Sequence, residues 1–152
     1  MNSKWIGGAA FLAVMTVFAA CNNDDDNNNN PTPTNNVVNL KADINGLQEK
    51  PTSTTSTATG TMTGTIDTTT NVMSYTVTYQ GITPTAGHIH RIDSANGTGA
   101  PIIPFASLTS PISGTTSLRR TQRDSILAGQ YYVNFHTAAY PNGEIRGDIK
   151  KQ

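Results

Sequence analysis

Strict alternation of apolar and polar residues is the feature that most constrains the fold of this chain. In residues 58–66 every second position is small or apolar, and threonines fill the positions between them. Residues 37–45 (VVNLKADIN) and 73–79 (MSYTVTY) alternate in the same way. Successive side chains of a β-strand point to opposite faces of the sheet. The pattern therefore predicts antiparallel strands that bury one face and expose the other.

The later part of the sequence also favours short strands over helices. Residues 130–137 (QYYVNFHT) and 144–150 (EIRGDIK) alternate. A proline inside 102–108 (IIPFASL) predicts an edge strand or a bulge, because proline lacks the N–H that a central strand donates. Residues 115–120 (TTSLRR) are a weaker strand candidate, and 123–128 predict one short helical turn that the following glycine ends. Seven or eight short strands without a long helix predict an all-β fold, an antiparallel β-sandwich or Greek-key barrel.

The composition excludes a nucleic-acid partner held by charge. The 152 residues carry a formal net charge of zero and only 13% of them are charged. The one local cluster of cations is Arg119, Arg120 and Arg123. A chain without a basic surface does not attract phosphate backbones through its field.

The N-terminus has the features of a secretory signal peptide. Lys4 precedes a short apolar run, residues 5–20, that ends in small residues directly before Cys21. The run is shorter than the ~20 residues that favour a membrane span. Residues 18–21 (FAAC) resemble the lipobox of bacterial lipoproteins, in which the cysteine is lipidated and becomes the first mature residue. The alternative is ordinary cleavage that leaves a free thiol.

The segment after the cysteine predicts a flexible tether. Residues 22–36 (NNDDDNNNNPTPTNN) contain no aliphatic side chain, so they cannot bury surface to offset the entropy of ordering. Their acidic start resembles a surface-export signal of bacterial lipoproteins. We expect a signal peptide in 1–20, a lipidated cysteine and tether in 21–36, and a β-domain in 37–152. Two acyl chains on Cys21 anchor a protein stably, which places it in the cell envelope, at the outer membrane or cell surface.

Four stretches, in order, carry a resemblance to a known family. They are the segment 44–67 that begins INGLQEKP, then MSYTVTYQGI (73–82), AGHIHRI (86–92) and LAGQYYVNFHTAAYPNGEIRGDI (127–149). Over about residues 40–149 the chain resembles the CHRD domain, named for chordin. The resemblance implies an all-β, immunoglobulin-like or barrel-like module outside the cytoplasm. It also implies interaction with an envelope protein or polysaccharide, and no defined catalytic activity.

The histidines are the candidate metal ligands. His88 and His90 are two residues apart, so a strand presents both imidazoles on one face. His136 lies on the polar face of residues 130–137, and the CHRD resemblance matches all three to histidines of the family. One interpretation is a three-histidine site for copper or zinc, with a fourth position for water.

The alternative interpretation of the histidines is a structural polar network. A buried imidazole with a hydrogen-bond partner is ordinary in proteins and needs no metal. Asn134 shares the face of His136, and Glu144 and Arg146 share a face of their own strand. These side chains are candidate partners for the rings, and the last two also predict a same-face ion pair. Both interpretations stay open, and no cofactor is firmly implied.

No residue is assigned a catalytic role. The sequence has no Gly-x-Ser-x-Gly elbow, and no motif selects a catalytic pair from its carboxylates. The threonine-rich faces are explained by the strand propensity of threonine better than by a glycan-binding surface. We expect a lipid-anchored cell-envelope CHRD protein with a binding or structural role, or else an extracytoplasmic metal-binding protein, rather than an enzyme.

Overall fold

The computed structural model describes residues 36–152. The expected signal peptide in 1–20 and the lipidated cysteine and tether in 21–36 lie outside the described residues, apart from Asn36, and stay predictions. Within the described residues no helix is both long and apolar enough to cross a membrane.

The described residues form nine strands and two short helical segments. The strands are β1 (Val37–Asn45), β2 (Thr59–Asp67), β3 (Val72–Gln80), β4 (Ala86–Arg91), β5 (Pro101–Pro104), β6 (Ile112–Ser117), β7 (Tyr131–His136), β8 (Ile145–Asp148) and β9 (Lys150–Lys151). The helical segments are the 3-10 turn η1 (Gly46–Gln48) and the helix α1 (Arg120–Leu127). All strand pairs are antiparallel.

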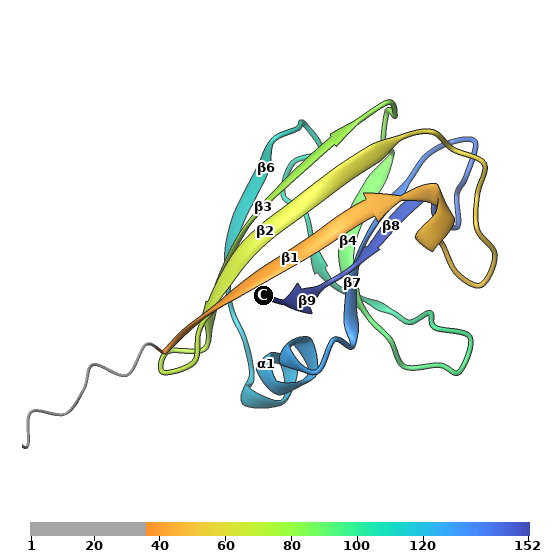
Figure 1. Ribbon diagram of the computed structural model, residues 1–152. Coiled ribbons are helices and arrows are strands. Elements are labelled where there is room, and N and C mark those ends of the chain that lie inside the picture. Colours follow the sequence, from red (N-terminus) through yellow and green to blue (C-terminus); the bar gives the residue numbers. More distant parts are fainter. Residues whose placement is uncertain (1–35) are drawn as a thin grey trace, which may run out of the picture. The chain divides into compact units, whose positions relative to one another are not determined.

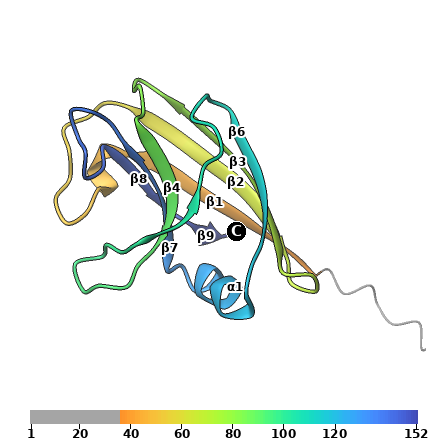
Figure 2. The same cartoon turned by 180° about the vertical axis from the view of Figure 1, so that it is seen from behind.

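The strands lie in a single sheet that curls into a half-barrel (Figures 1 and 2). The order is β5-β4-β7-β8-β1-β2-β3-β6, and β9 pairs with β1. The predicted all-β, antiparallel class is confirmed. The finer prediction of an immunoglobulin-like sandwich or a Greek-key barrel is not confirmed, because the described strands belong to one curled sheet.

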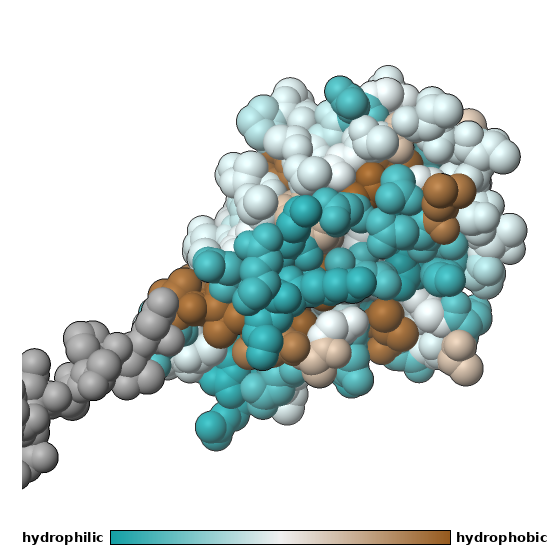
Figure 3. Space-filling model, in the orientation of Figure 1, coloured by the Kyte–Doolittle hydropathy of each residue, from teal (hydrophilic) through white to brown (hydrophobic). Residues whose placement is uncertain are grey.

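The alternating segments bury their apolar residues as predicted. β1 pairs with β2, and β2 with β3, in unbroken register over nine residues each. The apolar side chains of these strands are almost fully buried: Leu40, Ala42, Ile44, Met62, Ile66, Met73 and Val77. The positions between them are mostly exposed threonines and charged residues. Figure 3 shows a hydrophilic surface over β1 and β9, beside the paler, threonine-rich surface of β2 and β3.

The helix and the edge strand also follow the sequence. α1 is longer than the predicted turn, and the side chain of Gln122 accepts the Arg119 backbone N–H at its start. The helix ends before Gly129, which has a φ of +75° that favours glycine. β5, with a proline at each end, lies at an edge of the sheet, and its pairing with β4 is irregular between Ile89 and His90.

One expectation is wrong for β7. The alternation predicts a half-buried strand, yet both faces of β7 are buried, from Tyr131 to Phe135. The inner face packs in the core, and two loops cover the outer face. One loop follows β4 and is held by Arg146, and the other follows η1 and is held by Glu144. This second, polar layer contains the histidines.

Candidate metal centre

The histidines lie on the outer face of β4 and β7. His88 is paired with Asn134, His90 with Tyr132, and Ala86 with His136 across these strands. Directly paired residues of an antiparallel sheet share a face, so the three imidazoles are on one side. The intervening residues, such as Ile89, are fully buried in the core on the opposite side.

The three rings converge as the metal-site interpretation requires. One nitrogen of each ring lies within 4.8 Å of the other two. Ring centroids are 5.4 Å apart for His88 and His90, 5.5 Å for His88 and His136, and 5.8 Å for His90 and His136. His90 is buried, whereas the other two are half-buried. Three imidazoles therefore form a compact cluster that reaches the surface at His88 and His136.

Backbone carbonyls fix the protonation of two rings. Nδ1 of His90 is 2.9 Å from the carbonyl oxygen of Gly99, and Nδ1 of His136 is 3.0 Å from that of Pro141. A carbonyl oxygen only accepts, so each Nδ1 carries the proton and donates it. In the neutral ring Nε2 is then an unprotonated acceptor. This tautomer is the one that suits binding of a metal ion through Nε2.

Within residues 36–152, two buried ring nitrogens have no hydrogen-bond partner. They are Nδ1 of His88 and Nε2 of His90. Most buried polar atoms in proteins are hydrogen-bonded, and an unpaired one needs an explanation. Here the two atoms belong to rings that meet edge to face, at an angle of 83°, and both rings lie beside His136.

Burial keeps the cluster neutral. It lowers the pKa of His88, His90 and His136 below the ordinary value of 6.5. The neighbouring His136 lowers the pKa of His88 further, while the bond to Gly99 partly opposes the shift at His90. Neutral imidazoles are the form that binds metals, so no proton has to be displaced near neutral pH.

Gly99 and Tyr132 hold His90 in place. The Tyr132 ring stacks on His90 with centroids 4.8 Å apart and planes 15° apart. Its hydroxyl accepts the Gly99 N–H at 3.2 Å. Gly99, whose carbonyl accepts the hydrogen bond from His90, is thus itself held in place. A Cβ at position 99 would collide with the carbonyl oxygen of Arg91. Only glycine allows the loop to approach this closely.

Arg146 secures the same loop from β8. Its side chain is only 2% exposed, and its Cζ is 3.6 Å from the centroid of the Tyr132 ring. Nη1 donates to the carbonyl of Gly97 at 2.7 Å, and Nε and Nη2 donate to Asp148. The ion pair of Arg146 is thus made with Asp148, and the predicted pair with Glu144 is not observed.

The other predicted network residues bond to groups outside the rings. The carboxylate of Glu144 accepts from Ser56, at 2.7 Å, and from Thr137. Asn134 donates to the buried carboxylate of Glu49 and to the carbonyl of Ile145. These contacts join the loop after η1 to the turn between β7 and β8. They form a polar network, but its hydrogen bonds do not satisfy the histidines.

Glu49 is a buried site residue that the sequence analysis missed. Its exposure is 6%, and burial raises its pKa although its bonds to Lys50 N–H and Asn134 oppose the shift. Nothing in the local sequence marks it, because it follows a 3-10 turn instead of an alternating strand. The one feature of the sequence that points to Glu49 is its position in segment 44–67, which carries part of the resemblance to the CHRD domain.

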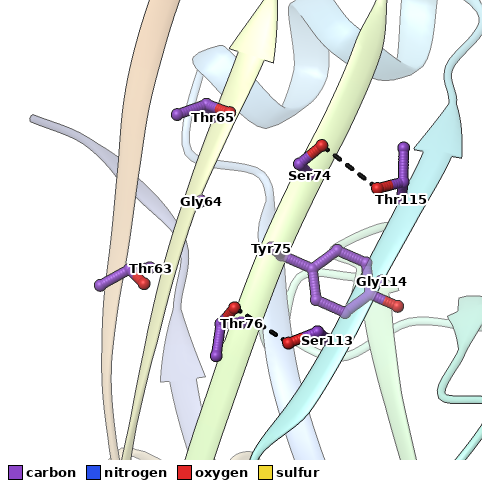
Figure 4. Close-up of a pocket in the computed structure, with 9 residues that line it drawn as sticks. All are labelled: Thr63, Gly64, Thr65, Ser74, Tyr75, Thr76, Ser113, Gly114 and Thr115. Atoms are coloured by element: carbon purple, nitrogen blue, oxygen red, sulfur yellow. Dashed lines mark hydrogen bonds between the residues drawn. The ribbon is translucent and has the colours of Figure 1, made fainter.

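A separate hollow lies on the outer face of β2, β3 and β6 (Figure 4). Hydroxyls line it, and they bond to one another across the strands, Ser74 to Thr115 and Thr76 to Ser113, both at 3.2 Å. The hollow holds no charged or titratable group except the phenol of Tyr75, which packs against Gly114. The hollow has the properties of a solvated, threonine-rich strand surface, as expected if the threonines are present because of their strand propensity.

Comparison with known proteins identifies a family. Residues 40–149 match the CHRD domain, and no curated protein and no solved structure matches the chain. The match covers well over half of the sequence and nearly all of the described sheet. The chain therefore belongs to the CHRD domain family.

Proposed function

We propose that this CHRD domain protein binds one transition-metal ion, copper or zinc, through His88, His90 and His136. The observation that carries the proposal is the pair of buried, unpaired ring nitrogens within a cluster of three neutral imidazoles. Each orphaned nitrogen costs about 1–3 kcal/mol when no partner replaces water. A metal ion at the centre of the cluster removes that cost.

The surroundings of the cluster favour a metal over a polar network. Metal-bound histidines usually donate their other ring N–H to a carbonyl or carboxylate, as His90 and His136 do here. Zinc–nitrogen bonds of about 2.0–2.1 Å put tetrahedral ligands roughly 3.4 Å apart. The ring nitrogens lie within 4.8 Å of one another, so ring movements of about 1 Å close the site.

The ligand type restricts the metal. Three imidazoles without thiolate or carboxylate suit zinc and copper and are poor ligands for calcium or magnesium, which prefer oxygen. Copper(II) binds a given nitrogen site more tightly than zinc. We therefore expect copper to displace zinc at equal concentration.

We also propose that the domain acts in the cell envelope, anchored through lipid on Cys21. This part of the proposal is supported by the sequence of residues 1–36 alone: an apolar leader, a lipobox-like FAAC and an asparagine- and aspartate-rich segment. Retention of radiolabelled fatty acid by the protein, and its loss in Cys21→Ser, tests it. The proposal would be contradicted if wild-type protein from labelled cells carried no fatty acid and was recovered in the soluble fraction.

Metal content tests the central proposal. The chain from residue 21 onward, with Cys21→Ser and no histidine tag, is incubated with one equivalent of Cu²⁺ or Zn²⁺ and desalted. We expect one ion per chain by mass spectrometry of the metal, and none in His88→Ala/His90→Ala. All three histidines of the chain are in the cluster, so any imidazole nitrogen found coordinated to the bound metal must come from this site.

The acidic run Asp24–Asp26 supplies the matched control. Carboxylates also bind divalent ions, and this run is the densest group of them in the sequence. Changing the three residues to asparagine should leave the stoichiometry at one. The proposal is wrong if the wild type retains no metal, or if the histidine variant keeps its ion while its circular dichroism shows it folded.

A further inference from the structure

We infer that a metal ion held by His88, His90 and His136 keeps one coordination position open to solvent and binds a small inorganic anion there. This inference rests on the proposed metal site. It goes further because it names the class of ligand that the site takes and separates an open, reactive site from a closed, structural one.

The number of donors gives the first argument. Among the described residues, the cluster comprises three histidines and no carboxylate or thiol. Structural zinc sites have four protein ligands, whereas sites that bind exogenous ligands have three and leave a position for water. Copper(II) also takes at least four ligands. Three imidazoles therefore leave one position to fill.

The neighbouring carboxylates are already committed to other groups. Glu144 accepts from Ser56 and Thr137, and Asp148 accepts two bonds from Arg146. Glu49 accepts from Asn134 and from the Lys50 backbone. A carboxylate would have to give up these partners to reach the metal. The fourth ligand thus has to come from solvent.

Charge decides that this ligand is an anion. The imidazoles are neutral, so they leave the double positive charge of the ion uncompensated. The guanidinium of Arg146 is buried against Tyr132, the ring that stacks on His90, and adds positive charge to the neighbourhood. In a partly buried site such charges act more strongly than in water. An anion is therefore preferred over a neutral molecule.

The exposure of the rings gives the route. His90 is buried under the loop that contains Gly99, and its Nε2 is buried, as is Nδ1 of His88. His88 and His136 are half-buried, so the cluster faces solvent on their side. Pro141, whose carbonyl accepts from His136, is exposed at the same place. The route for an anion therefore passes these two rings, and because Nδ1 of His88 is also buried, its ring has to move to uncover the centre.

Azide is the probe for this position. The copper(II)-loaded protein is titrated with sodium azide while the near-ultraviolet charge-transfer band and the electron paramagnetic resonance spectrum are followed. We expect a new band that saturates at one azide per copper, with a change in the copper hyperfine splitting and competition by cyanide. Replacement of the open-position water by the anion explains all three observations.

Asp148 offers a variant that leaves the ligands intact. Asp148→Asn removes the negative charge that balances Arg146, and because this carboxylate is 37% exposed we expect the variant to fold. The freed positive charge should raise the azide affinity roughly threefold. Asp124→Asn is the matched control, because Asp124 makes the same kind of ion pair with Arg123 on α1. It should leave the azide affinity unchanged.

The outcomes separate this inference from the proposed function. If the protein binds no copper, the metal site itself fails. If it binds one copper and azide changes neither spectrum, the site is closed and the inference is overturned while the metal site stands. A band that never saturates would also overturn it, because azide would then not occupy one defined position on the metal. Equal azide affinities in wild type and Asp148→Asn would overturn the argument that local charge selects an anion.

Discussion

Replacement of Arg146 by methionine tests how the outer face of β7 is held. Methionine replaces the apolar stem of arginine with a side chain of similar length, but it removes the hydrogen bond to the Gly97 carbonyl, worth about 1.5–3 kcal/mol. It also removes the contact with the Tyr132 ring, worth about 1–2 kcal/mol. The pair with Asp148 adds about 1 kcal/mol or less, because water re-solvates that partly exposed carboxylate.

One term acts in the opposite direction. A buried guanidinium costs several kcal/mol to desolvate, and methionine does not carry that cost. The offset is partial because Gly97 loses its partner and the loop above Tyr132 loses an anchor. We expect the free energy of unfolding to fall by about 2 kcal/mol.

Urea unfolding followed by circular dichroism measures this loss, and the thermal midpoint should fall by roughly 8 °C. Arg120→Met is the control, because Arg120 is exposed at the start of α1, and it should change stability by less than about 0.5 kcal/mol. The reasoning is refuted if Arg146→Met is as stable as the wild type. It is refuted equally if the two variants lose the same stability, since burial would then be irrelevant.

Three further predictions concern the cluster and the hydroxyl face. Because the folded-state pKa values of the histidines are lowered, the unfolded chain binds more protons than the folded chain below pH 6.5. The metal-free protein should therefore lose stability as pH falls through that range. Urea titrations should show a smaller loss of stability in the variant with all three histidines changed to glutamine. Gly99→Ala should weaken metal binding about 10–100-fold in a chelator competition, because the displaced loop withdraws the carbonyl that orients His90. Thr76→Val should change the unfolding free energy by less than about 0.5 kcal/mol in urea, since its hydroxyl lies on a solvated face.

The raised pKa of Glu49 makes stability depend on pH in the opposite direction. The pH prediction therefore compares the wild type with the triple glutamine variant. A carboxyl whose folded pKa exceeds 4.5 stabilises the fold below that pH and loses this contribution as pH rises through its folded value. Its effect therefore opposes that of the histidines. Glu49 is present in both the wild type and the triple variant, so the difference between their pH profiles reports the histidines.

The sequence predicted the strands and the core because each depends on local alternation. Leu40, Ala42 and Ile44 occupy one face of β1 whatever the strand order is, and they are buried as expected. The same reasoning put His88 and His90 on one face. It could not supply the strand order, which brings β7 beside β4 and thereby adds His136 to the pair.

The burial of the outer face of β7 could not be read from periodicity, because loops produce it. Glu144, Arg146 and Asp148 alternate along one face, so spacing alone allows Arg146 to pair with either acid. The structure selects Asp148 because Ser56 and Thr137 occupy Glu144. Those partners come from a loop that is distant in the sequence and from the turn after β7. Long-range contacts of this kind leave no local pattern.

The tautomers fixed by the backbone explain why His90 and His136 do not satisfy each other. With Nδ1–H of His90 and His136 donating to carbonyls, their Nε2 atoms carry lone pairs, and two lone pairs cannot form a hydrogen bond. A proton captured by the cluster would supply a donor, but burial lowers the pKa of all three rings and so opposes it. The fold thus disfavours an added proton at a place where the lone pairs of His90 and His136 favour a cation. A metal ion meets both conditions, because it binds several nitrogens at once and gains from each, whereas a proton is shared by at most two.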